Sequence, residues 1–146
     1  MCIAIMVGWS DYQWAETART AAFEISRTFE KRGNSTLWFL GHWGFQYYLE
    51  ALSGKAIDLK NQKAMPGDII ILPANNTYSQ IKNISSFQEQ NPLIQLFEVG
   101  PYQWLTTMNY SMGAGFYSNI WGPLPFAFGL SDPEKYYAHM IKQHSS

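Results

Sequence analysis

A corner in the first third of the sequence has the residue types that could bind a small polar ligand. It is Gly41-His42-Trp43-Gly44, followed closely by Gln46. An imidazole can donate a hydrogen bond to a sugar hydroxyl or a phosphate, and an indole can pack against the C–H face of a sugar ring. His42, Trp43 and Gln46 are therefore candidate ligand-binding residues. In the alternative interpretation, the His42 imidazole simply satisfies a backbone group at the start of a helix.

Two further positions offer similar chemistry. Asn75 and Asn76 follow the apolar run 69–72 and Pro73, so their amides would lie at the end of a buried strand, where ligands bind in open α/β sheets. Trp121 lies in a glycine-flanked aromatic segment and could line a saccharide groove. Both also have structural interpretations, because asparagines after a proline are ordinary turn formers and glycine-flanked aromatics often pack in turns.

Other chemistries find little support in the sequence. The pair Gly41 and Gly44 lacks the third glycine of a dinucleotide-binding turn, the carboxylates are scattered, and no GxSxG motif is present. The single cysteine, Cys2, can form neither an internal disulfide nor a zinc site. We therefore predict no catalytic residue, no metal site and no cofactor. A net charge of -1 argues against binding to nucleic acid.

The composition indicates a surface that is poor in charge. Charged residues make up 14% of the chain, against about 25% in typical soluble domains. Aromatic residues reach 16%, so some must be exposed. Such a surface suits a protein that rests against a larger partner or a membrane face.

Periodicity and turn signals predict an α/β fold in one domain, residues 11–146. We expect a three-layer sandwich with a mostly parallel central sheet, a long N-terminal helix and an irregular, β-rich second half. The helices are expected at 11–32, 45–53 and 133–142, the last because Ser131-Asp132-Pro133-Glu134 has the form of a helix start. The strands are expected at 36–40, 56–59, 69–72, 93–99 and 104–108.

Residues 1–10 form a separate apolar segment. Residues 1–9 hold no charged side chain, yet as a helix they would reach only about 13 Å, too short to cross a bilayer. Two interpretations remain open, namely a first buried strand or the end of a membrane helix that runs into the helix at 11–32.

Three segments together resemble the extracytoplasmic C-terminal domain of bacterial membrane glycosyltransferases related to dolichyl-phosphate-mannose protein mannosyltransferases. Their order and spacing carry the resemblance, which spans nearly the whole chain. The segments are Trp38-Phe39-Leu40-Gly41-His42-Trp43-Gly44-Phe45-Gln46-Tyr47-Tyr48, then Pro66-Gly67-Asp68 with the strand that follows, and residues 113–126.

The resemblance implies a polytopic enzyme that transfers a sugar from a polyprenyl-phosphate donor on the extracytoplasmic, periplasmic face of the membrane. This domain would follow the last membrane helix, and its partners would be the transmembrane part of the same transferase or the membrane surface, with a lipid-linked sugar or glycan acceptor nearby. The family's catalytic acidic residues lie in an external loop near the N-terminus of the whole enzyme and have no counterpart here.

The sequence therefore supports two main hypotheses of different classes. The first is an accessory domain of a membrane glycosyltransferase that does not itself perform the transfer. The alternative is a free-standing carbohydrate-binding or ligand-binding α/β module. An independent small enzyme is the third and least supported.

Overall fold

The longest element of the fold is a single straight helix, α1 (Cys2–Phe29), which is about 42 Å long. The computed structural model describes residues 2–33, 35–57, 64–74, 87, 89–100, 103–117 and 122–142. The predicted helix at 11–32 is confirmed, but it begins at Cys2. Residues 2–10 are therefore helical, and the strand alternative for this segment is wrong. No helix in the described ranges is both long and apolar enough to span a bilayer.

Five strands form the main sheet in the order β2-β1-β3-β9-β4. They are β1 (Leu37–Phe39), β2 (Lys55–Ala56), β3 (Ile69–Pro73), β4 (Leu93–Val99) and β9 (Glu134–Met140). β1 pairs in parallel with β2 and β3, whereas β9 pairs antiparallel with β3 and β4. The sheet is therefore mixed, and the prediction of a mostly parallel sheet is wrong. The strands predicted at 36–40, 69–72 and 93–99 are confirmed, and of the strand predicted at 56–59 only its first part lies in the described residues.

The helix predicted at 133–142 is the clearest error, because these residues form β9 in the middle of the sheet. The capping pattern at Ser131 and Asp132 is local, and it is overridden by pairing on both sides of the strand. Tyr136 and Ala138 alternate toward the helices and are buried, as expected for a strand with period two. Sheet pairing and burial of both faces outweigh a short capping signal.

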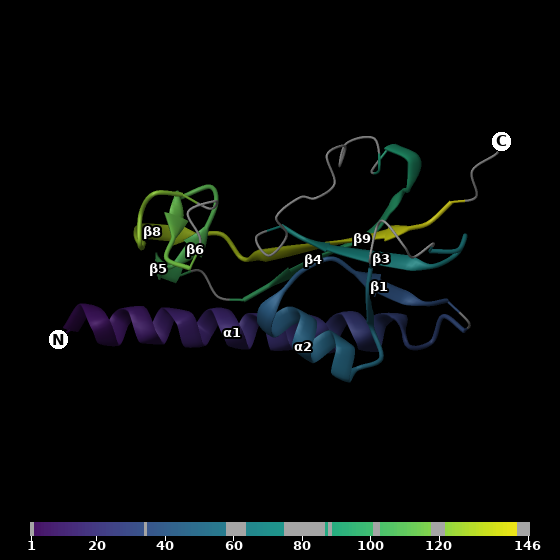
Figure 1. Ribbon diagram of the computed structural model, residues 1–146, viewed down its shortest axis with the longest axis horizontal. Helices are drawn as coiled ribbons and strands as arrows, with labels where there is room; N and C mark the ends of the chain where they lie inside the picture. Colours follow the sequence, from purple (N-terminus) through teal and green to yellow (C-terminus); the bar gives the residue numbers. More distant parts are fainter. Residues whose placement is uncertain are drawn as a thin grey trace.

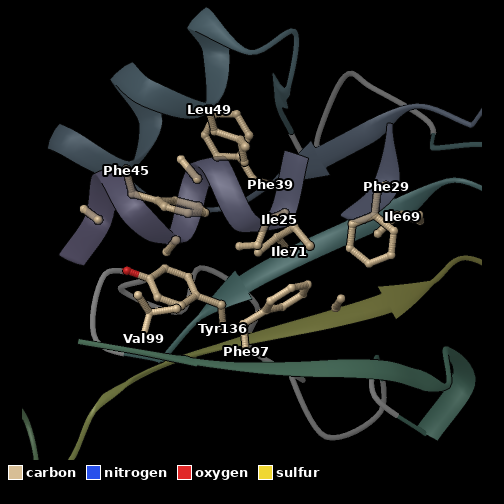
Figure 2. Packing of buried hydrophobic residues seen from close by; sticks show 14 residues of the cluster. Ile25, Phe29, Phe39, Phe45, Leu49, Ile69, Ile71, Phe97, Val99 and Tyr136 are labelled. Carbon is tan, nitrogen blue, oxygen red and sulfur yellow. The ribbon is translucent and has the colours of Figure 1, made fainter. Parts of the chain in front are cut away.

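Both helices cover the same face of the sheet (Figure 1). The helix α2 (Trp43–Ala51) crosses α1, and Gly44 lies where the two helices meet, so that a Cβ there would stand 3.9 Å from Ala18 Cβ. Figure 2 shows Ile25 of α1 beside Ile71 of β3, and Phe45 of α2 next to Tyr136 of β9, with ring centroids 4.9 Å apart. These side chains belong to one continuous hydrophobic core.

The opposite face of the sheet is also buried. Ile70, Leu72 and His139 on this face are almost fully covered, and the ring of Phe87 packs edge-on against His139 with centroids 5.8 Å apart. Of the three predicted layers, the structure therefore shows two, namely the sheet and one layer of helices (Figure 1). The described residues place no helix longer than a single turn over the second face.

A smaller β unit packs against the N-terminal half of α1, away from the main sheet (Figure 1). It contains the antiparallel pairs β5 (Gln103–Thr106) with β8 (Ala127–Ser131) and β6 (Met108–Asn109) with β7 (Ala114–Gly115). Gly100, in the link from β4, has φ +105° and passes so close to α1 that a Cβ would lie 2.7 Å from Thr17 Oγ1. The strand predicted at 104–108 is thus split between β5 and β6, and the second half of the chain is rich in β-structure as expected.

Candidate functional site

The predicted corner is a strand, a turn and a helix start, as the sequence indicated. His42 is the N-cap residue of α2 with extended backbone (φ −131°, ψ 178°), and its exposed side chain makes no capping hydrogen bond. Gln46 donates a hydrogen bond from Nε2 to Glu50 Oε1 at 2.9 Å, within the same helix. Neither residue lines the two larger cavities described below, which lie beside the N-terminal half of α1.

The remaining predicted site residues are not brought together by the described part of the structure. Trp43 is the first residue of α2, and its side chain lies outside what the structure describes. Asn75, Asn76 and Trp121 also lie outside the described residues. The predicted saccharide site therefore stays a prediction.

The structure instead assembles a polar cluster around Asp11, on the N-terminal half of α1. Thr107 Oγ1 donates a hydrogen bond to Asp11 Oδ1, and Tyr117 Oη donates one to Asp11 Oδ2, both at 2.5 Å. A cavity of about 560 Å³ opens beside this cluster, lined by Asp11, Trp14, Ala15 and Tyr117. The cavity is thus lined by one carboxylate and two aromatic side chains, and the carboxylate is held in place by two hydrogen bonds.

The electrostatics of this cluster are dominated by the carboxylate. The hydrogen bond to Asp11, together with burial and the negative charge of Asp11, raises the pKa of Tyr117 to about 12. The phenol therefore stays protonated at neutral pH and keeps donating to the carboxylate. Since each Asp11 oxygen already accepts one hydroxyl, its remaining lone pairs are the ones available to a ligand.

A second cavity lies on the other side of the same end of α1. It has a volume of about 430 Å³ between α1 and β5, and Ser10 forms a buried link across its base, with Oγ donating to the Leu105 carbonyl oxygen at 2.6 Å. Its lining is mainly apolar and includes Ile5, Met6, Trp9 and Trp104. This groove has no charged lining residue among those described.

Both cavities lie within an extended apolar surface that we call the apolar end. It consists of exposed side chains from the first turns of α1 and from the small β unit, with Trp104 73% and Ile5 66% exposed. The full set is Ile3, Ile5, Met6, Trp9, Tyr12, Trp104, Tyr110, Phe116, Tyr117, Leu124, Phe128 and Leu130. Most of the exposed large hydrophobic side chains of the described residues are gathered here. Monomeric soluble proteins rarely expose patches of this extent without a partner.

The apolar end is also nearly free of charge. Residues 99–131 contain no Asp, Glu, Lys, Arg or His, and Asp11 is the one charged side chain between Met1 and Ala15. This charge-free run is the sequence signal that could have revealed the surface. Thr107 and Tyr117 could not have been linked to Asp11 in the same way, since they lie 96 and 106 positions away.

Two other buried polar groups belong to the fold rather than to a cavity. Asp68 accepts hydrogen bonds from Thr36 N, Trp38 Nε1 and Met65 N at 2.8–2.9 Å, which ties β1 to the turn before β3. His139 Nδ1 lies 2.9 Å from the Asn91 carbonyl oxygen, and its Nε2 has no hydrogen-bond partner within the described ranges. The described residues also hold no group of His, Cys, Asp or Glu that could bind a metal ion.

Comparisons with protein-family models, with curated proteins and with solved structures found no match to this chain.

Proposed function

We propose that this chain is the extracytoplasmic, periplasmic domain of a membrane glycosyltransferase that uses a polyprenyl-phosphate-linked sugar. In this proposal the domain carries no catalytic acid of its own. It places its apolar end against the membrane surface or the transmembrane part of the same enzyme, and thereby helps to shape the acceptor side. The resemblance of the three segments to that family supplies the enzyme class.

The observation that carries the proposal is the uncharged, exposed start of α1 together with the small β unit. Ile3, Ile5 and Met6 point in different directions around the helix, yet all three are about half exposed or more. A helix that is apolar on all sides is normally buried in protein or in a bilayer. This segment is covered on only part of its circumference by β5, so the rest requires an apolar environment.

Aromatic side chains mark the boundary of this segment. Trp9 and Tyr12 are both exposed and contact each other, with ring centroids 5.7 Å apart. Trp and Tyr are enriched at membrane–water interfaces, where their amphipathic rings lie at headgroup level. Trp104 of β5 and Trp9 line the same groove, so aromatic rings from two elements collect at this level.

The test uses the natural gene with its complete reading frame and an affinity tag at the C-terminus of its product. We expect the tagged product to be much larger than 16.7 kDa, to fractionate with membranes, and to transfer labelled mannose from polyprenyl-phosphate mannose. The matched control lacks residues 11–146, and its membranes should retain the protein but lose most of the transfer. A tagged product of 16.7 kDa in the aqueous fraction, or membranes with no transfer from any polyprenyl-phosphate sugar, would contradict the proposal.

A further inference from the structure

The carboxylate of Asp11 forms no ion pair with any residue that the structure describes. Within the part of the chain that the structure describes, the ion pairs join Arg19 to Glu16 and Lys135 to Glu98, and no lysine or arginine pairs with Asp11. Among the described residues, the neutral hydroxyls of Thr107 and Tyr117 donate to its carboxylate. An isolated carboxylate at the edge of an apolar surface is stabilised when a cation approaches it.

The other lining residues also favour a cation. Trp14 and Tyr117 contribute aromatic rings to the cavity, and the ring faces of Trp and Tyr attract ammonium groups. A carboxylate combined with aromatic rings is the arrangement that binds methylated or primary ammonium groups in proteins. A phosphate would be repelled by Asp11. A neutral sugar could donate hydroxyls to the remaining lone pairs of Asp11, but it would leave the negative charge without a counter-charge.

The position of the cavity along α1 identifies the source of the ammonium group. Asp11 follows Trp9 by about 3 Å along the helix axis, and the cavity extends one turn further to Ala15. The headgroup layer beyond the hydrocarbon core is about 5–8 Å thick on each side of a bilayer. If the apolar end is at the membrane, as the proposed function states, the cavity lies within this layer.

We propose that the Asp11 cavity binds the ammonium group of a zwitterionic phospholipid headgroup, such as that of phosphatidylcholine or phosphatidylethanolamine. Asp11 provides the charge, and Trp14 and Tyr117 provide the aromatic walls. This inference rests on the proposed function for the orientation of the domain, and it adds a lipid preference that an apolar surface alone would not have.

The test measures binding of the full 146-residue chain to vesicles of phosphatidylcholine and of phosphatidylglycerol with identical acyl chains. We expect the wild-type chain to prefer phosphatidylcholine, and the Asp11→Asn variant to lose about tenfold in affinity for it, which corresponds to about 1.4 kcal/mol. Tyr117→Phe keeps the charge and should stay within about threefold of wild type. Glu24→Gln, which removes an exposed carboxylate about 20 Å further along α1, should have no effect.

A soluble probe separates the headgroup from other sources of ammonium. Tetramethylammonium should shift the indole N–H signal of Trp14 in the NMR spectrum of the wild-type chain but not in Asp11→Asn. Shifts caused by phosphocholine without any preference between vesicles would favour a free amine ligand and overturn the lipid proposal. Shifts caused by methyl mannoside at the same residues, with none from tetramethylammonium, would identify a sugar site instead.

Failure of this inference is distinguishable from failure of the proposed function. One outcome is that the double variant Trp9→Ser with Trp104→Ser abolishes vesicle binding, while the headgroup and Asp11→Asn have no effect on it. This outcome would support the membrane-facing apolar end and refute the ammonium site. Absence of binding to either vesicle by a wild-type chain shown to be folded by its NMR spectrum would refute the ammonium site and the contact with the lipid surface. The transfer assay with the complete gene would then decide the proposed function by itself.

Discussion

Replacing Asp68 by asparagine should destabilise the protein by about 2 kcal/mol at neutral pH. The Asp68 side chain is only 7% exposed and accepts three hydrogen bonds, one on Oδ1 and two on Oδ2. An asparagine keeps one acceptor oxygen, so its amide group must face at least one of these three donors. Hydrogen bonds to charged groups contribute about 1.5–3 kcal/mol each, and solvent near the exposed Met65 moderates the loss. Asp68→Ala, which removes all the acceptors, should cost about 3 kcal/mol.

The effect of Asp68→Asn should depend on pH in a defined direction. Burial acts to raise the pKa of the Asp68 carboxyl, but hydrogen bonds from Trp38, Thr36 and Met65 outweigh burial and hold the pKa below its ordinary value of 3.8. Because the folded pKa lies below the unfolded one, the carboxylate contributes its full stability above the unfolded pKa. That contribution is lost as the pH falls through the folded pKa. The difference between wild type and Asp68→Asn should therefore shrink below about pH 4.

The assay is urea unfolding of both proteins at pH 7 and at pH 3, with thermal unfolding as a second measurement. The expected loss corresponds to a decrease in Tm of about 6 °C for a chain of this length. Glu24→Gln is the matched control, because Glu24 is an exposed carboxylate on α1, and its free energy of unfolding should not change. A loss that is as large at pH 3 as at pH 7, or a variant as stable as the control, would refute the role assigned to the carboxylate.

Three further predictions concern close packing, the link between α1 and the small β unit, and the Asp11 cluster. Gly54→Ala should lower the free energy of unfolding in urea by about 1–3 kcal/mol, because a Cβ would lie 2.7 Å from Leu49 Cγ and 2.9 Å from the Leu49 carbonyl oxygen. Gly8→Ala is the control, because a Cβ there meets nothing within 4 Å, and it should not destabilise the protein. Ser10→Ala removes the buried hydrogen-bond donor to the Leu105 carbonyl oxygen, so it should lower the free energy of unfolding by about 1 kcal/mol and speed hydrogen exchange in β5. Thr28→Ala removes an exposed hydrogen bond within α1 and should leave hydrogen exchange in β5 unchanged. Tyr117 should titrate near pH 12 by NMR of its labelled ring, and Asp11→Asn should return its pKa toward 10; an unchanged pKa would mean that the two side chains do not interact in solution.

The parts of the fold that could be predicted are those specified by local pattern. The period of 11–32, the apolar run 69–72 and the glycine-bounded corner at His42 each predict their element without knowledge of the rest of the chain. Elements set by distant partners were not predictable in this way. β9 carries a helix-start pattern but forms a strand because β3 and β4 pair with it on both sides.

The candidate site follows the same division. His42 and Gln46 were identified because they are neighbours in sequence. In the structure Gln46 is hydrogen-bonded within α2, and neither residue lines the Asp11 cavity or the groove between α1 and β5. The Asp11 cluster joins α1 to two segments about a hundred positions away, so no spacing rule could have indicated it. Asp68 was identified only as part of the segment Pro66-Gly67-Asp68, whereas two of its three hydrogen bonds come from Thr36 and Trp38, at the start of β1.

The small β unit depends on its neighbours for stability. β5 to β8 are short strands in two-stranded pairs, which are marginal when isolated, and several of their large side chains face outward. Their attachments to α1 are polar and specific, through Ser10 with Leu105 and Asp11 with Thr107 and Tyr117. Leu105, Met108 and Ala127 of this unit are buried, but Trp104, Phe128 and Leu130 remain exposed, so these three gain most of their hydrophobic stabilisation only when another apolar surface covers them. These exposed side chains support the proposal that the apolar end contacts another apolar surface, and the vesicle-binding measurement tests whether that surface is a membrane.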